Sequence, residues 1–275
     1  NVLVLGSTND SLLACLLGAT SVNPLPPHYR CNNCHYTTFN CDHYEDGWDM
    51  PDAVCPVCGG SMEGDGHRLS SRSLAMRLPD ISLRVPNEMR QLVTDFIPDY
   101  WQCMDENGTL TVEPYSDEEL TALRLVQSDG QQGIIEIGAL QDNAPALEGL
   151  PPLPPTYHHI KAMGLHLAEG AWSRAEQVAI HRGEIDFLDV IAFREDVYDL
   201  IRRHTPPKAR AENGIPWQIM EAVRKGKYAR CGMPEELKRY LSCTLRLPKY
   251  YISALKRIEY LPRKGDCVAR WMMDE

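Results

Sequence analysis

Two pairs of closely spaced cysteines constrain this chain more than any other feature of its sequence. Cys31-Asn-Asn-Cys34 and Cys55-Pro-Val-Cys58 each have the spacing of a short turn, and Gly59-Gly60 follows the second pair. Two such turns can place four thiolates at the corners of a tetrahedron, the geometry in which cysteines bind Zn²⁺. Because four protein ligands leave no coordination position for water, we predict a structural zinc site at Cys31, Cys34, Cys55 and Cys58.

The other cysteines and the first residues bear on the cellular compartment. Six of the ten cysteines are scattered along the chain, and its start lacks the basic segment of a secretory signal peptide. Both observations favour a metal site in a reducing, cytoplasmic compartment over a disulfide framework. His35, Cys41 and His43 lie near the pairs, so one of them could replace a cysteine ligand, although we expect surface or supporting roles for them.

Composition and charge narrow the class of protein further. With 43% hydrophobic and 24% charged residues the chain is globular, and its longest apolar run, 12 to 19, is too short for the roughly 20 residues that span a membrane. The net charge of −10 is concentrated in residues 1 to 140, which contain 7 arginines, no lysine and 20 acidic residues. Residues 156 to 275 have a net charge of +5, so only this half is suited to nucleic-acid phosphates.

Turn residues and apolar periodicity divide the chain into three parts. We expect a domain at 1–140 with a metal-binding insertion at 25–68, a proline-rich linker at 141–155 and a helical domain at 156–275. In the first domain the pattern predicts strands at 2–5, 81–85, 109–112 and 133–139, and helices at 9–17 (capped by Asn9 or Asp10), 88–97 and 116–126. In the helical domain it predicts helices at 172–181, 185–203, 215–226, 234–243 and 248–260.

Longer motifs around the cysteines resemble a known family. Val22-Asn-Pro-Leu-Pro-Pro-His-Tyr-Arg-Cys31, with the second cysteine pair and Asp65-Gly-His67, is similar to the zinc motif of PolC-type DNA polymerase III alpha, the replicative polymerase of low-GC Gram-positive bacteria. Further matches, in family order, are Leu5-Gly6-Ser7, Pro79-Asp-Ile-Ser-Leu83, Ile134-Ile-Glu-Ile-Gly138, Met163-Gly-Leu165, Trp172-Ser-Arg-Ala-Glu-Gln177, Arg194-Glu-Asp196, Ile219-Met-Glu-Ala-Val-Arg-Lys-Gly-Lys227 and Pro248-Lys-Tyr-Tyr-Ile252.

The resemblance implies a fold and an active site. The fold would be α+β: a nucleotidyltransferase-like (polymerase beta-like) palm remnant with an inserted four-cysteine zinc ribbon, followed by an all-helical, fingers-like region. The family holds two Mg²⁺ ions with three carboxylates. Here those positions are Asp80, Ser82 and Glu136, and serine cannot supply the missing charge. The family's turn also carries an arginine for the incoming nucleotide, which Leu5-Gly-Ser-Thr-Asn9 lacks.

These departures indicate a degenerate active site. Asp80 and Glu136 are also closer together in sequence than the corresponding family carboxylates, so the palm is shortened. We expect the two carboxylates to be remnants, with weak binding of one Mg²⁺ ion as the alternative.

A basic segment is the candidate contact for DNA. Arg224, Lys225, Lys227 and Arg230 follow one another closely at the end of a predicted helix. The resemblance implies contact with DNA phosphates, whereas a solvated helix end carries the same charges without a partner.

Three functions remain open from the sequence. The first is a catalytically inactive PolC-like module, stabilised by zinc, that binds DNA or a replication protein. The second is a low-activity or split DNA-directed DNA polymerase whose missing carboxylate comes from another chain. The third is a regulator that mimics the polymerase and binds proteins only.

Overall fold

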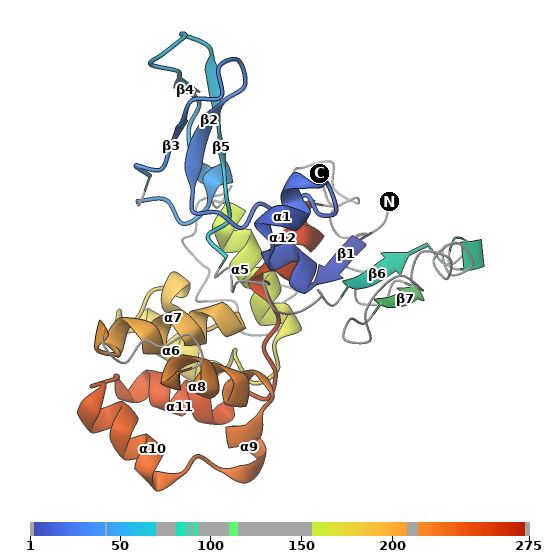
Figure 1. Cartoon of the computed structure of the whole chain (residues 1–275). Coiled ribbons are helices and arrows are strands. Elements are labelled where there is room, and N and C mark those ends of the chain that lie inside the picture. The colour runs from blue at the N-terminus through green and yellow to red at the C-terminus, as the bar shows by residue number, and fades with distance from the viewer. Residues whose placement is uncertain are drawn as a thin grey trace. The chain divides into compact units, whose positions relative to one another are not determined.

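The chain has a mixed α and β fold, seen in a computed structural model that describes residues 3–41, 43–69, 81–86, 89, 91–92, 110–114, 156–207 and 214–272 (Figure 1). It forms two compact units. The described residues of the first unit are those up to 114, 156–157 and 265–272, and those of the second are 158–264. The end of the described chain therefore folds together with its beginning.

A three-stranded sheet lies in the first unit. It consists of β1 (Leu3–Gly6), β6 (Ile81–Val85) and β7 (Leu110–Pro114) in the order β1-β6-β7. β1 and β6 are antiparallel, and β6 and β7 are parallel. These strands correspond to those predicted at 2–5, 81–85 and 109–112. The elements predicted at 88–97, 116–126 and 133–139 lie mostly or wholly outside the described residues.

The segment after β1 differs from its prediction. A 3₁₀ turn, η1 (Ser7–Asp10), precedes α1 (Leu12–Leu16), and the helix cap is Ser11, whose Oγ accepts the Ala14 N–H at 3.2 Å. The prediction of Asn9 or Asp10 as the cap is wrong. Asn9 is fully buried, and its side chain is already engaged with the Val4 carbonyl, Asp266 and Thr20.

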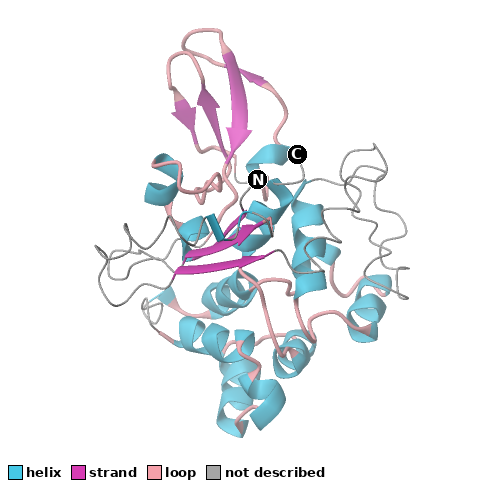
Figure 2. Ribbon diagram, turned by 90° about the vertical axis from the view of Figure 1, so that its right-hand side faces the viewer, coloured by secondary structure: helices cyan, strands magenta, loops and turns pink. Residues whose placement is uncertain are grey.

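A second, four-stranded sheet carries the paired cysteines. Its strands are β2 (His28–Cys31), β3 (Thr37–Thr38), β4 (Ala53–Val54) and β5 (Ser61–Asp65), in the antiparallel order β3-β2-β5-β4, with the 3₁₀ turn η2 (Gly47–Asp49) before β4. Figure 2 shows this sheet separate from the β1-β6-β7 sheet. We call residues 28–65 the ribbon. The buried apolar cluster that includes Cys31 and Cys55 is small, with Met62 as its third member, so this end of the ribbon gains little stability from apolar burial.

Helices form the described part of the second unit, apart from one isolated bridge between Glu169 and Tyr260. They are α5 (Thr156–Leu167, whose first two residues belong to the first unit), α6 (Arg174–His181), the 3₁₀ turn η6 (Phe187–Asp189), α7 (Arg194–His204), α8 (Ile215–Arg224), α9 (Lys227–Cys231), α10 (Glu235–Arg239), the π-helical turn Tyr240–Thr244 and α11 (Lys249–Arg257). Within the described part of the chain, no helix combines the length and the apolar character needed to cross a membrane.

The helix predicted at 185–203 is broken into η6 and α7. The break has a local cause: the Asp196 carboxylate accepts the N–H groups of Ala192 and Phe193 at 2.8 and 3.1 Å, which starts a new helix at Arg194. α5 and α12 (Lys264–Met272) were not among the predicted helices. Apart from Lys264, α12 belongs to the first unit, and Figure 1 shows it beside β1 and α1.

Close packing and buried charge pairs hold the helical unit together. Gly164 of α5 allows the Phe193 ring to approach, since a Cβ at Gly164 would lie 2.2 Å from that ring. Lys161, almost fully buried, donates to the Leu188 carbonyl and to Asp196. Because buried charges are stable only when paired, these contacts fix how α5 packs against α7.

Candidate metal centre

The two cysteine pairs form turns with the same backbone hydrogen bonds. In residues 31–36 the Cys31 N–H donates to the Tyr36 carbonyl at 2.9 Å, and the His35 N–H donates to the Cys31 carbonyl at 3.0 Å. In residues 55–60 the Cys55 N–H donates to the Gly60 carbonyl at 2.8 Å, and the Gly59 N–H donates to the Cys55 carbonyl at 2.9 Å. We call each turn a knuckle. β2 and β4 lead into them, so the sheet places the knuckles side by side.

One residue of each knuckle has a left-handed backbone. Gly59 has φ 73° and His35, at the equivalent position, has φ 60°. Glycine adopts this conformation without steric cost, whereas histidine does not. The turn therefore favours glycine at this position, and His35 adopts the same backbone in the first knuckle at some steric cost.

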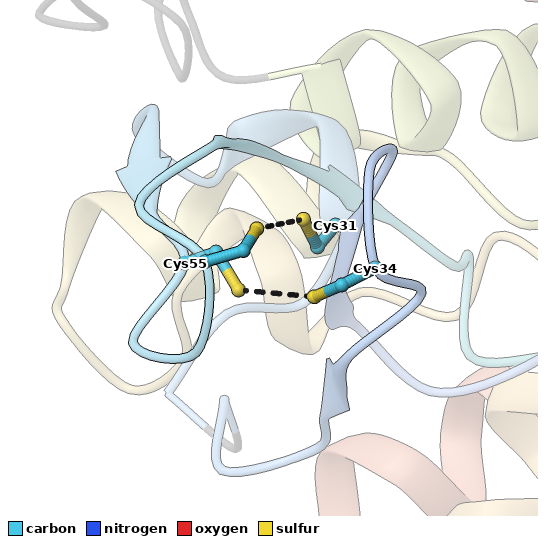
Figure 3. Close-up of side chains that lie close together, drawn as sticks. Cys31, Cys34 and Cys55 are labelled. Atoms are coloured by element: carbon cyan, nitrogen blue, oxygen red, sulfur yellow. Dashed lines mark hydrogen bonds between the residues drawn. The ribbon is translucent and has the colours of Figure 1, made fainter.

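The four sulfurs gather in one place. Cys31 Sγ lies 3.5 Å from Cys58 Sγ, Cys34 Sγ lies 3.5 Å from Cys55 Sγ, and all four lie within 4.8 Å of one another. Figure 3 shows the sulfurs of Cys31, Cys34 and Cys55 pointing toward one another. Four sulfurs at about 2.3 Å from a zinc ion would be about 3.8 Å apart. The cluster therefore fits one tetrahedral ion, and thiolates suit Zn²⁺ and not Mg²⁺.

Two thiols of the cluster, those of Cys31 and Cys34, have strongly shifted pKa values. The backbone N–H of Cys34, then that of Asn33, stabilises the Cys31 thiolate and lowers its pKa to about 6. At Cys34 the Tyr36 N–H favours the thiolate, but desolvation and the neighbouring cysteines outweigh it and raise the pKa to about 12. The negative charge of one thiolate thus makes ionisation of the neighbouring thiol less favourable. Four thiolates together require a cation, which is the chemistry of a metal site.

The base of the ribbon explains the Asp65-Gly-His67 motif. Gly66 has φ 95°, and a Cβ there would lie 2.4 Å from the Pro26 carbonyl oxygen. His67 is fully buried, and its Nδ1 lies 2.9 Å from Oδ2 of the equally buried Asp46. Asp46 was not among the predicted residues. A buried histidine signals a polar partner, but a separation of 21 positions does not reveal which residue it is.

The alternative ligands lie elsewhere. In the described part of the chain, the group of potential metal ligands around the knuckles consists of the four cysteines. Cys41 is buried, with its Sγ 3.9 Å from the Thr38 carbonyl, and the His43 ring packs on Tyr44.

The resemblance expects carboxylates at three positions, and one of them, Ser82 on β6, lies among the described residues. Ser82 is opposite Leu5, and Ile81 is opposite Gly6. The Gly6-Ser7 turn and the strand with Ser82 are therefore neighbours in one sheet. Asp80 and Glu136 lie outside the described residues.

The four basic candidates gather at the junction of α8 and α9. Arg224 donates twice to the Glu221 carboxylate, at 2.5 and 2.9 Å, and Lys225 Nζ lies 3.2 Å from the same carboxylate. Arg230 donates to the Lys225 carbonyl, and Lys227 is exposed. Glu221 therefore offsets part of the positive charge of this basic cluster, Arg224, Lys225, Lys227 and Arg230.

Sequence comparison relates part of the chain to one kind of protein. It is 42% identical over 97 residues to the DNA polymerase III PolC-type of Thermotoga petrophila, a match that covers 34% of this chain and 7% of the relative. The protein of the same name from Lacticaseibacillus paracasei is 40% identical over 98 residues, covering 34% and 7%. That from Bacillus subtilis is 41% identical over 88 residues, covering 30% and 6%. No family model matches the chain.

The resemblance to PolC-type DNA polymerase III therefore holds over about a third of this chain. The matched stretch spans only about 7% of the length of the relatives.

Proposed function

We propose that this chain is a catalytically inactive, zinc-stabilised module, related to PolC-type DNA polymerase III, that binds DNA through its helical half. In this proposal residues 1–140 are a shortened palm with the zinc-binding insertion at 25–68. Residues 141–155 are the linker, and residues 156–275 are the fingers-like part, whose last helix, α12, folds with the first unit.

The four-cysteine cluster supports the zinc-binding part of this proposal. The two matching knuckles bring Cys31, Cys34, Cys55 and Cys58 within 4.8 Å of one another, and the ribbon has little apolar core of its own. A structural zinc ion supplies folding energy to such a domain when it binds. The proposed role of the four cysteines is to hold that ion and so to keep the ribbon folded.

The observation that carries the loss of catalysis is Ser82 on β6. Two-metal nucleotidyl transfer needs carboxylates to hold a pair of Mg²⁺ ions about 4 Å apart. Ser82 presents a neutral hydroxyl at the position where the resemblance expects the second carboxylate, next to the Gly6-Ser7 turn. Asn9, at the end of that turn, is fully buried and hydrogen-bonded within the protein, so it cannot reach a nucleotide.

The basic cluster at the α8–α9 junction supports binding to DNA. Lys225, Lys227 and Arg230 are exposed there, and phosphate contacts from lysine and arginine give affinity without sequence specificity. Because Glu221 offsets part of this charge and residues 1 to 140 are acidic, we expect modest affinity that falls steeply with salt.

Fluorescence anisotropy with labelled primer–template and single-stranded DNA, at two salt concentrations, tests this function. The logarithm of the binding constant falls as the logarithm of the salt concentration rises, and each lost phosphate contact makes this negative slope shallower by about 0.9. Lys227→Ala and Arg230→Ala should each weaken binding and reduce this slope, whereas Arg182→Ala, an exposed arginine at the end of α6, should not. No binding at low salt would contradict the DNA proposal and favour the protein-only regulator.

A primer-extension assay with Mg²⁺ and deoxynucleotides tests the loss of catalysis. We expect no extension. Template-dependent extension that Asp80→Ala abolishes would contradict the proposed inactivity and would instead indicate the low-activity or split polymerase.

A further inference from the structure

The arrangement of the four cysteines points to a second property of the ribbon. It rests on the proposed zinc site and concerns what happens to the cysteines under oxidation. Cys34 and Cys58 are exposed, whereas Cys31 and Cys55 are buried, with exposed fractions of 0% and 2%. Each knuckle thus contains one exposed and one buried cysteine.

Two sulfur contacts cross between the knuckles. The exposed Cys58 lies 3.5 Å from the buried Cys31, and the exposed Cys34 lies 3.5 Å from the buried Cys55. The knuckles themselves also touch, because a Cβ at Gly60 would lie 2.5 Å from Asn33 Nδ2. A disulfide has a sulfur–sulfur distance of about 2.05 Å, so small side-chain movements can close either cross-knuckle pair.

We infer that the cysteine cluster is a redox switch, in which a hydroperoxide converts its four thiols into two cross-knuckle disulfides, Cys31–Cys58 and Cys34–Cys55. Four cysteines allow three pairings, and we assign this one because both of its sulfur–sulfur distances are 3.5 Å and each bond joins an exposed cysteine to a buried one. Disulfide sulfurs no longer offer the thiolate donors that a cation needs, so oxidation releases bound zinc.

The chemistry proceeds in two balanced steps for each pair. The exposed sulfur attacks one peroxide oxygen and the O–O bond breaks, which gives a sulfenic acid and hydroxide. The hydroxide takes a proton from solvent, because zinc holds this sulfur as a thiolate, and becomes one water molecule. The buried sulfur then attacks the sulfenic sulfur, the S–S bond forms, and the S–O bond breaks. The hydroxide that leaves takes a second proton from solvent, since the buried sulfur is also a thiolate in the zinc-bound cluster, and becomes the second water. Two equivalents of hydrogen peroxide therefore oxidise the four thiols and are reduced to water.

Hydrogen peroxide titration of the zinc-loaded full chain tests the inference. Zinc release is followed with a chromophoric chelator, and the loss of thiols by their reaction with a disulfide reagent. Cleavage at Asp46, Asp49 and Asp52 separates the two knuckles into different peptides. Cross-knuckle bonds keep those peptides joined under non-reducing mass spectrometry, whereas bonds within each pair leave them separate. We expect joined peptides and one zinc ion released for four thiols lost.

Double variants distinguish this pairing from the other cross-knuckle pairing. Cys34→Ser/Cys55→Ser leaves Cys31 and Cys58, which should form the disulfide. The matched control, Cys34→Ser/Cys58→Ser, leaves the two buried sulfurs Cys31 and Cys55, which should stay reduced. If either variant does not fold, partial reduction of the oxidised wild-type protein identifies the same bonds.

Separate peptides after oxidation, or bonds joining Cys31 to Cys55, would overturn the inference. A purified, reduced chain that contains no zinc would instead contradict the proposed metal centre, and the crosslinks of that same sample would still test the pairing.

Discussion

The Asp266 carboxylate accepts a hydrogen bond from the Gly6 backbone N–H at 2.8 Å, although 260 positions separate the two residues. The same oxygen accepts the Asn9 side-chain amide at 3.1 Å. α12 is thereby tied to the turn that follows β1, which places the last described helix in the first unit. The first unit thus depends on residues from both ends of the described chain.

Asp266→Ala should destabilise the first unit. The variant leaves the Gly6 N–H and the buried Asn9 amide without this acceptor, and a lost bond to a charged group costs about 1.5–3 kcal/mol. Urea unfolding measures the change in the free energy of unfolding. Glu236→Ala, which removes an exposed carboxylate from α10, is the control and should leave this free energy nearly unchanged. Equal stabilities of the two variants would contradict the structural role of Asp266.

Cys55→Ser should lower the zinc content and the melting temperature together. Structural zinc contributes about 10 kcal/mol or more of apparent binding energy in small zinc-binding peptides, so one missing ligand weakens the whole ribbon. Metal analysis and thermal unfolding of the same preparation provide the two measurements. Cys243→Ser changes an exposed cysteine outside the cluster and should alter neither. Unchanged zinc stoichiometry in Cys55→Ser would rule out the four-cysteine site.

The two left-handed positions of the knuckles should respond in opposite ways to substitution. Gly59→Ala should cost about 1 kcal/mol, because only glycine adopts φ 73° without strain. Nothing lies within 4 Å of the added methyl group, so the backbone accounts for the whole effect. His35→Gly relieves the same strain at φ 60° and should be neutral or stabilising. Thermal unfolding of the zinc-loaded variants compares the two, and a Gly59→Ala variant as stable as wild type would contradict the shared turn geometry.

Asp49→Ala should destabilise the start of α5. Asp49, in η2, accepts the Thr156 N–H at 2.5 Å and the Tyr157 N–H at 3.0 Å, so it caps the helix from a distant part of the chain. Loss of a helix cap costs about 0.5–2 kcal/mol. Chemical denaturation compares this variant with Asp52→Ala, an exposed aspartate of the ribbon, for which we expect little change. A loss of the same size in both would show that general charge, and not capping, is responsible.

Glu221→Gln should raise the affinity for DNA and steepen its salt dependence. Removing this carboxylate frees Arg224 and Lys225, and each added phosphate contact steepens the slope of log K against log salt by about 0.9. The anisotropy titration measures both quantities. Arg182 and Glu184 form an exposed pair just after α6, so Glu184→Gln removes the same charge away from the basic cluster and is the control. Equal affinities of the two variants would argue against DNA contact at this junction.

The same carboxylate makes a contribution to stability that depends on pH. Burial favours the neutral form of Glu221, but the hydrogen bonds and charges of Arg224 and Lys225 outweigh it and lower the pKa below the ordinary value of 4.5. The stabilisation is therefore present above pH 4.5 and is lost as the pH falls through the lower pKa of the folded state. In acid unfolding measurements below pH 4.5, the Glu221→Gln variant should therefore lose less stability than the wild type as the pH falls.

The sequence predicted the parts of the site that depend on local spacing. The CxxC pairs predicted the four-cysteine cluster because a short turn fixes where each pair of sulfurs points. The strands around Leu3 and Ile81 followed from short apolar runs. The sequence did not predict α5 or α12. Both helices make hydrogen bonds to distant parts of the chain: Asp49 of η2 accepts the N–H of Thr156 at the start of α5, and Asp266 in the first turn of α12 accepts the N–H of Gly6.

The amino-acid sequence by itself determined the two cysteine pairs of the cluster, the glycine at the left-handed position of the second knuckle, and the serine at position 82. These depend on the chemistry of single residues and on turns a few residues long. Only the tertiary structure decided that Asp46 pairs with His67, that Asn9 is buried and engaged, and that Asp266 closes onto Gly6. Such partners are chosen by where the folded chain brings them, because a hydrogen bond depends on distance in space and not on separation in sequence.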